Sequence, residues 1–275
     1  MKNLWRTLTV AFLVGVSSVI SAVSALPECL QAAETASAAD KKQEHVKEIS
    51  VAETSEFAVH QHDISVQDRM GRALYQGRYP ELVAKDGASH GLRAALQKWN
   101  AEERANWQVS DKKLRADVRA MQEAGYPILA PYYIYDNVVN WSRIDNRILS
   151  FCLRQESYTG GAHPNHVYRA WTVDLTTGRP LALHDIVTNR RDFLTAVAAA
   201  FRAQYTGREI ETFTKNIDTQ LELAHPYLDW DRDVVWTMLP DGGIRVYYGA
   251  YAIAPYSAGD FIVDLTPEQA PYLFR

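Results

Sequence analysis

Two glycines, a histidine and a proline are concentrated in the segment Tyr158-Thr-Gly-Gly-Ala-His-Pro-Asn165. The adjacent Gly160 and Gly161 permit backbone angles and close approaches that other residues rarely adopt. A proline follows His163 and pushes that residue towards an extended conformation. The sequence therefore predicts an imidazole that is presented from a constrained loop.

The chemistry open to this loop is that of an imidazole with polar neighbours. His163, Asn165 and His166 lie close in sequence, and an imidazole acts as a base, a ligand or a hydrogen-bond donor. The alternative is structural: the glycines shape a turn, and His163 and Asn165 satisfy backbone groups. Both interpretations stay open, and neither completes a catalytic set.

A second segment, Tyr251-Ala-Ile-Ala-Pro-Tyr-Ser-Ala-Gly259, also combines aromatic residues with proline and small side chains. Such surfaces bury a large area while losing few rotamers, which suits recognition of a protein or a glycan. For any one tyrosine, packing in the core is the alternative. We expect the two segments to form one exposed surface that binds a partner without transforming it. The candidate ligand contacts are Tyr158, Gly160, Gly161, His163, Asn165, Tyr251 and Tyr256.

Carboxylates near the loop offer an alternative, catalytic function. Glycoside hydrolysis uses a paired acid and base, and the first candidates are Glu156, Asp174 and Asp185. A Gly-x-Ser-x-Gly pattern at 87–91 also precedes a predicted helix. However, the residues before it are too charged and too few for the buried strand that ends in a nucleophile elbow. We expect Ser89 to cap the helix instead.

Two further patterns partly match metal sites. The run Asp229-Trp-Asp-Arg-Asp233 begins like a calcium loop, but Val234 stands where the turn needs glycine and Pro240 where the bidentate glutamate belongs. His60 and His62 would share one strand face, but no third ligand is spaced nearby. We predict no metal and no cofactor.

Strands and helices must position these residues, and their predicted order lacks the regular β-α-β alternation of a parallel sheet. Helical spacing at 92–99 and at 114–121 predicts two helices, of which the second ends at Gly125. Residues 46–66 predict one or two strands with a bulge. Further strands are predicted at 132–139, 147–157, 166–175, 233–239, 244–251 and 261–265, and further helices at 193–201 and 210–223. Short turn signals favour antiparallel pairing, so we predict an α+β fold with antiparallel sheets, packed helices and two small, closely associated domains.

The first residues predict export. A basic start is followed by a largely apolar run over 8–23 and by small residues suited to signal-peptidase cleavage after Ala25. We expect a signal peptide over 1–25 and a flexible tether over 26–47. The mature protein would then be periplasmic or secreted and would keep no membrane-spanning segment. An uncleaved anchor is the alternative, and a lipid on Cys29 is disfavoured because a glutamate precedes it.

Composition and charge limit which classes of partner and fold are expected. The net charge of −4 and the absence of any long run of Lys and Arg make nucleic acid an unfavourable partner. The hydrophobic fraction of 47% suits a globular core. Cys29 and Cys152 would both reach an oxidising compartment, so a disulfide between them is one interpretation. The other is that Cys152 is a small apolar residue of a buried strand.

Motifs spread along the chain resemble the RsiV-like extracytoplasmic family (DUF3298), preceded by a domain like the N-terminal part of the peptidoglycan deacetylase PdaC (DUF4163-like). In the first half they are Tyr79-Pro-Glu-Leu82, Ile148-Leu-Ser-Phe151, the 158–165 loop, and Val173-Asp-Leu-Thr-Thr-Gly178 with Leu181, Leu183 and Asp185. In the second half they are Val246-Tyr-Tyr248, the 251–256 segment and Gly259. The resemblance implies one domain over 48–178 and a second over 179–275.

The resemblance also implies a place at the cell envelope, because the family includes an anti-sigma factor that senses lysozyme. This sequence shows neither a sigma-binding segment before the apolar run nor a deacetylase domain after 275, so neither of those activities is expected here. We predict a non-catalytic binding or sensing module whose partner is peptidoglycan, another glycan or a lysozyme-like protein. The alternatives are an envelope glycan hydrolase, or an accessory domain of one, and a purely structural envelope protein.

Overall fold

The computed structural model of the chain describes residues 43–207, 210–226 and 231–275. The predicted signal peptide, Cys29 and most of the predicted tether lie outside the described residues, as does the start of the calcium-like run. The described residues belong to one compact unit, Lys41–Arg275. This unit combines helices with mainly antiparallel strands, which confirms the predicted α+β class.

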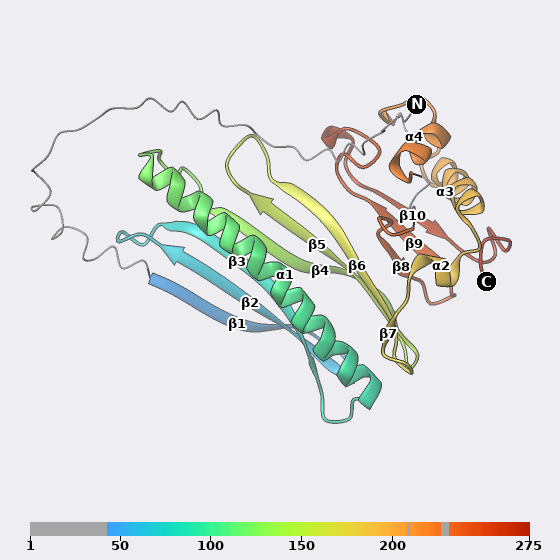
Figure 1. Cartoon of the computed structure of the whole chain (residues 1–275), viewed down its shortest axis with the longest axis horizontal. Helices are drawn as coiled ribbons and strands as arrows, with labels where there is room; N and C mark the ends of the chain where they lie inside the picture. The colour runs from blue at the N-terminus through green and yellow to red at the C-terminus, as the bar shows by residue number, and fades with distance from the viewer. Residues whose placement is uncertain (1–42, 208–209, 227–230) are drawn as a thin grey trace, which may run out of the picture. The chain divides into compact units, whose positions relative to one another are not determined.

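Seven strands form the larger sheet, in the order β1-β2-β3-β4-β5-β6-β7 (Figure 1). Their bounds are β1 Gln43–Glu53, β2 Phe57–Gln67, β3 Ala73–Ala84, β4 Tyr132–Ile144, β5 Ile148–Tyr158, β6 Asn165–Asp174 and β7 Arg179–Pro180. Neighbouring strands are antiparallel except β3 and β4, which run parallel and are joined through the helix α1. A parallel pair needs such a crossover, and α1 lies along one face of the sheet (Figure 1).

Strand β1 starts earlier than expected, because residues 43–47 belong to it and not to the tether. The pairing of β1 with β2 shifts register between Ser50 and Ala52. The sequence predicts the bulge between Val59 and Ile64, from the clash of apolar parity there. That position is wrong, because β2 pairs with β3 in unbroken register from Phe57 to Val66. Strands β4, β5 and β6 lie close to where the alternation of side chains predicts them.

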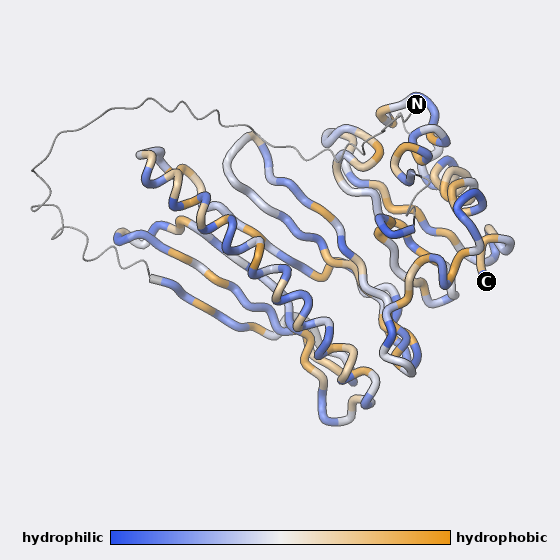
Figure 2. The backbone as a smooth tube through the Cα atoms, in the orientation of Figure 1, coloured by the Kyte–Doolittle hydropathy of each residue, from blue (hydrophilic) through white to orange (hydrophobic). Residues whose placement is uncertain are grey.

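Helix α1, His90–Glu123, is one helix where the sequence predicts two. Its buried stripe continues across the polar middle through Glu103 and Trp107, and Figure 2 shows hydrophobic positions recurring along it between hydrophilic ones. No glycine or proline occurs between Leu92 and Glu123. Ser89 caps the helix as predicted, since its hydroxyl accepts a hydrogen bond from the Leu92 backbone N–H at 3.1 Å.

Strand β3 is the longest element that the sequence analysis missed. Gly77 and Pro80 interrupt its pattern and are typical of turns. In the structure a Cβ at Gly77 would lie 2.8 Å from Cζ2 of Trp107, so glycine lets α1 approach the sheet. Pro80 lies beyond Arg78, the last β3 residue that pairs with β4, where the strand no longer needs an N–H on that side.

The smaller sheet has three strands in the order β10-β9-β8, namely β8 Trp236–Met238, β9 Ile244–Tyr248 and β10 Phe261–Leu265. The helices of this half are α2 Leu183–Ile186, α3 Arg190–Gln204 and α4 Ile217–Ala224, with a short 3₁₀ turn at Tyr256–Ala258. Residues 240–243 join β8 to β9 as a hairpin, with a hydrogen bond from Leu239 N to Gly243 O. The helix expected at 210–223 is shorter and begins only at Ile217.

The two sheets meet through hydroxyl groups on the face of the larger sheet that is opposite α1. Met238 N donates to Ser150 Oγ at 2.8 Å, and Ser142 Oγ donates to Thr237 Oγ1 at 2.6 Å. Cys152, on the same face of β5, is a fully buried thiol without a disulfide partner among the described residues. Burial raises its pKa to about 12. The smaller sheet thus covers one end of this face and leaves the other end for the candidate site.

Candidate binding surface

Residues 159–164 form the hairpin loop between β5 and β6, and both of its glycines adopt the left-handed backbone region. Gly160 has φ 87° and Gly161 has φ 120°. The Tyr158 hydroxyl donates a hydrogen bond to the Gly161 carbonyl at 3.1 Å. The glycines therefore carry the turn, as the structural interpretation of the loop requires.

The second segment folds against this loop. The ring of Tyr256 stacks on the imidazole of His163 with centroids 3.9 Å apart and planes 21° apart. The Tyr256 hydroxyl donates to the Pro164 carbonyl at 3.1 Å, and His163 Nδ1 donates to the same oxygen at 2.9 Å. Because Nδ1 is the donor, Nε2 of the exposed His163 is left to accept a hydrogen bond when the ring is neutral. The structure thus brings together residues 93 positions apart in sequence.

Asp260 fastens the second segment to β6. Its two carboxylate oxygens lie 2.6 Å from His166 Nε2 and 2.7 Å from the Tyr168 hydroxyl. Burial and the hydrogen bond to Asp260 raise the pKa of Tyr168. The His166 side chain is only 7% exposed. Sequence analysis missed this junction, although an aspartate directly after Gly259 was a signal that could have found it.

Two tyrosines of β4 extend the aromatic area. The rings of Tyr133 and Tyr135 stack with centroids 4.5 Å apart, and Tyr133 lies 5.9 Å from Tyr158. The Tyr133 hydroxyl donates to Glu156 Oε1 at 2.8 Å. Burial and this carboxylate raise the pKa of Tyr133 to about 12. The period-2 spacing of the two tyrosines could have placed them on one face.

We call Tyr133, Tyr158, His163, Tyr251 and Tyr256, together with the carboxylate of Glu156, the aromatic surface. Tyr251 is 54% exposed, has φ 65°, and its ring centroid lies 5.8 Å from that of Tyr256. Asn165, the remaining candidate, is exposed at the start of β6, and its side chain makes no hydrogen bond within the described residues. The surface therefore contains four of the predicted ligand contacts and Glu156, which was predicted only for the catalytic alternative. Tyr133 was not predicted.

The carboxylates proposed for hydrolysis do not gather near the loop, so that expectation is wrong. Glu156 belongs to the aromatic surface, but Asp174 ends β6, about 30 Å along the strand from Asn165. Hydrogen bonds from Thr176 lower the pKa of Asp174. Burial opposes ionisation of Asp185, but bonds from the Ala182 N–H and Arg179 lower its pKa overall. Both aspartates are thus ionised and accept hydrogen bonds from backbone N–H groups of nearby residues.

A buried charge cluster lies on the opposite face of the larger sheet, beneath α1. Arg169 of β6 donates to both oxygens of Glu103 at 2.8 Å and to Asp136 Oδ2 at 2.9 Å. Burial of Asp136 raises its pKa to about 7, against the lowering effect of Arg169. Glu103 occupies an apolar position of the helical stripe, and this mismatch was the sequence signal for the cluster.

The two imidazoles of the metal-like pair in β2 contact carboxylates. His60 Nδ1 lies 2.6 Å from Glu48 Oε1, and His62 Nε2 lies 2.7 Å from Glu81 Oε2. His62 Nδ1 also lies 3.7 Å from the other oxygen of Glu48, which therefore contacts both imidazoles. Within 43–207, 210–226 and 231–275, no group of three or more His, Cys, Asp or Glu side chains is arranged to hold a metal ion.

Comparison with known proteins identifies relatives by structure only. No protein-family model and no curated protein matches the sequence. The crystal structure of a DUF3298 family member from Bacteroides fragilis is similar with a TM-score of 0.54 and 18% identity, over 86% of this chain and 94% of that chain. A DUF3298 family protein from Pseudomonas aeruginosa matches with a TM-score of 0.48 and 16% identity, over 85% and 92% of the two chains.

The first likeness shows that the chain shares the fold of a DUF3298 family member, which supports that part of the resemblance drawn from the motifs. The DUF4163-like first domain, the lysozyme-sensing relative and the division at 178–179 stay predictions. In the part of the chain that the structure describes, no helix has the length and apolarity to cross a membrane.

Proposed function

We propose that this chain is an exported, non-catalytic binding module of the cell envelope, and that its aromatic surface holds an envelope glycan or a lysozyme-like protein. The observation that carries the proposal is the stack of His163 on Tyr256. This contact joins two distant segments into one exposed area.

The groups on this surface suit recognition of a polyhydroxylated or protein partner. Tyrosine rings offer flat apolar faces with polar tips, and they lose few rotamers on binding. Glu156 adds an acceptor beside Tyr133, and Arg154 lies 3.6 Å from its other oxygen. A sugar ring stacked on the tyrosines would find acceptors for its hydroxyls at Glu156 and at Nε2 of His163.

Binding is favoured over hydrolysis because Asp174 and Asp185, the other two carboxylates considered for hydrolysis, lie at the far end of β6 from Glu156. Glycosidases place two carboxyl groups roughly 5–9.5 Å apart across the scissile bond. Both oxygens of Asp260 are occupied by His166 and Tyr168. Export to the envelope is supported by the basic and apolar N-terminal pattern of the sequence.

The test is a pull-down of the exported protein against whole peptidoglycan, soluble glycan fragments and lysozyme. His163→Ala and Tyr256→Ala should each weaken binding to the component that is retained, while melting curves show that both variants remain folded. Tyr272→Ala is the matched control, because Tyr272 is 51% exposed and lies outside the aromatic surface.

Unchanged affinity in both folded variants would remove the aromatic surface from the proposal. Release of reducing ends or acetate from peptidoglycan by the pure protein would replace the binding module with an enzyme.

A further inference from the structure

Strand β6 has an edge that is left largely unpaired. Along one side it pairs with β5 over its whole length without a register shift. On the other side its partner is β7, which pairs only with Val173 and Asp174. Among the described strands none continues this pairing towards Asn165. Within 43–207, 210–226 and 231–275, the stretch 165–171 is therefore an open sheet edge.

The hydrogen bonds near β7 show which backbone groups face that edge. Leu181 N donates to Thr172 O at 2.9 Å, and Gly178 N donates to Asp174 O at 2.8 Å. Backbone groups alternate between the two sides of an antiparallel strand. The N–H and C=O groups of Tyr168 and Ala170 consequently point to the open edge, together with those of His166.

The open edge has one inward-pointing charge, Arg169, but lacks other devices that protect edge strands. Edge strands are commonly blunted by lysine, proline or bulges. The other edge strand of the sheet, β1, carries Lys47 and a register shift after Ser50. Residues 165–171, Asn-His-Val-Tyr-Arg-Ala-Trp, contain neither lysine nor proline.

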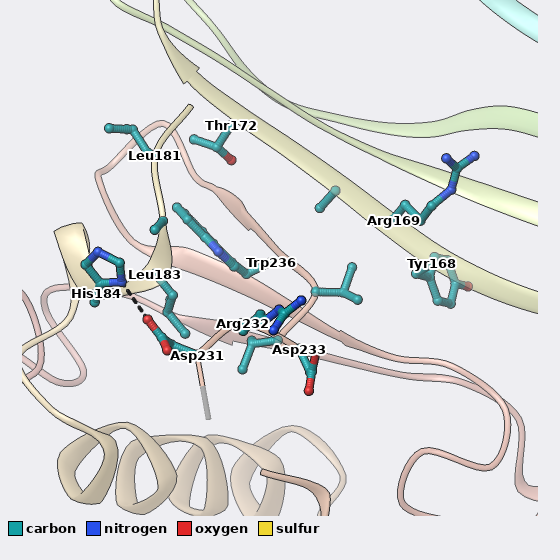
Figure 3. A pocket seen from close by; sticks show the side chains of 14 residues that line it. Tyr168, Arg169, Thr172, Leu181, Leu183, His184, Asp231, Arg232, Asp233 and Trp236 are labelled. Carbon is teal, nitrogen blue, oxygen red and sulfur yellow. Dashed lines mark hydrogen bonds and ion pairs between the residues drawn. The ribbon is translucent and has the colours of Figure 1, made fainter. Parts of the chain in front are cut away.

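A pocket of about 650 Å³ lies along this edge, as Figure 3 shows. One wall is β6 itself from Tyr168 to Thr172, and Val234 and Trp236 line the pocket with Leu183. Charged groups, including Asp231 bonded to His184 at 2.6 Å, also line it. The volume is within the range of ligand pockets.

We propose that the open edge of β6 is a docking site for an extended peptide segment of a partner protein, which adds as a strand beside β6. Alternating N–H and C=O groups at strand spacing are satisfied by another extended backbone and not by a sugar or a small anion. The apolar residues that line the pocket would accept alternate side chains of the added strand. The four β6 residues that line the pocket lie within positions 168–172. That stretch is about 17 Å long, so the segment is about five to six residues long.

The experiment is a selection of random linear peptides, displayed on phage, against the full chain, followed by affinity measurements on the enriched peptides. Ala170→Pro removes one edge N–H and leaves the ladder with β5 intact, because proline is tolerated where the N–H faces away from the partner strand. It should weaken binding about tenfold. Ala170→Val, which keeps the N–H, is the matched control and should bind normally.

N-methylated versions of the best peptide give a second test that does not depend on the folding of a variant. An added strand should lose binding when alternate amides are methylated and keep it when the intervening ones are. The proposal is overturned if no peptide is enriched, or if binding is indifferent both to Ala170→Pro and to the position of the methyl group. Self-association of the chain that Ala170→Pro abolishes would also overturn it, since the occupant would then be a second copy.

Discussion

The two halves of the described chain bury their interiors in different ways. Around α3 and the smaller sheet, one continuous cluster of apolar side chains runs from Leu183 to Leu273. Beneath α1 there are two separate clusters, one containing Trp99 and the other Trp107, and the charged Glu103 lies between them on the helix. A long helix can therefore be held to a sheet over a gap in its apolar core, provided that the buried charges in the gap are paired.

The charge cluster gives the largest expected effect. Arg169→Met should lower the free energy of unfolding by about 3–5 kcal/mol, because it leaves Glu103 and Asp136 buried without their cation. Denaturant titration measures the loss. Replacing all three members with apolar residues of similar size should restore most of the stability. A single variant as stable as the parent would show that water already reaches the cluster.

Lowering the pH should reduce the stability contribution of a residue in one half of the chain and increase that of a residue in the other. In the smaller half, burial lowers the pKa of His225 from 6.5 to about 4. Its contribution is present above pH 6.5 and is lost as the pH falls towards 4, because the unfolded chain takes up the proton first. The loss is on the order of 3 kcal/mol. His225→Gln should flatten this fall in stability-against-pH curves.

Asp136 should show the reverse. Its folded pKa is raised from 3.8 to about 7, so its contribution is present below pH 3.8 and is lost as the pH rises through about 7. Asp136→Asn, followed over the same pH range, should remove that loss. A variant with the parent's pH profile would mean that another member of the cluster carries the proton.

The hairpin loop between β5 and β6 belongs to neither core, so substitutions in it should lower stability less than those in the charge cluster. Gly160→Val and Gly161→Val should each cost about 1–3 kcal/mol, because both positions have positive φ. At Gly160 the new Cβ would also meet the Tyr132 hydroxyl at 3.1 Å. Melting temperatures of the two variants measure the cost. Valine variants that melt with the parent would show that the loop adopts another conformation.

His163→Ala should have the smallest effect on stability, roughly 0.5–1 kcal/mol, because it loses one exposed ring stack. Its melting temperature is to be compared with those of the glycine variants. If His163→Ala melts lowest of the three, the imidazole is a structural tie and its place on the aromatic surface is secondary.

Local patterns predicted the elements that carry the site, namely β4, β5, β6 and the cap at Ser89, because alternation and capping act over a few residues. They also indicated both loop segments. They could not predict that β3 is a strand, since the reason for Gly77 is Trp107 on a helix far along the chain. Junctions such as Asp260 with His166 depend on how two sheets pack, which no single segment encodes.

The contact between His163 and Tyr256 also sets an order of events. Loop and ring are 93 residues apart, and Tyr256 is held next to β10, the last strand. Contacts between residues so far apart in sequence form late in folding, because the intervening chain must first lose its conformational entropy. During synthesis, the first sheet can form while the aromatic surface is still incomplete. Recognition of a partner would then report that the chain has folded to its final strand, and truncated or partly folded copies would be silent.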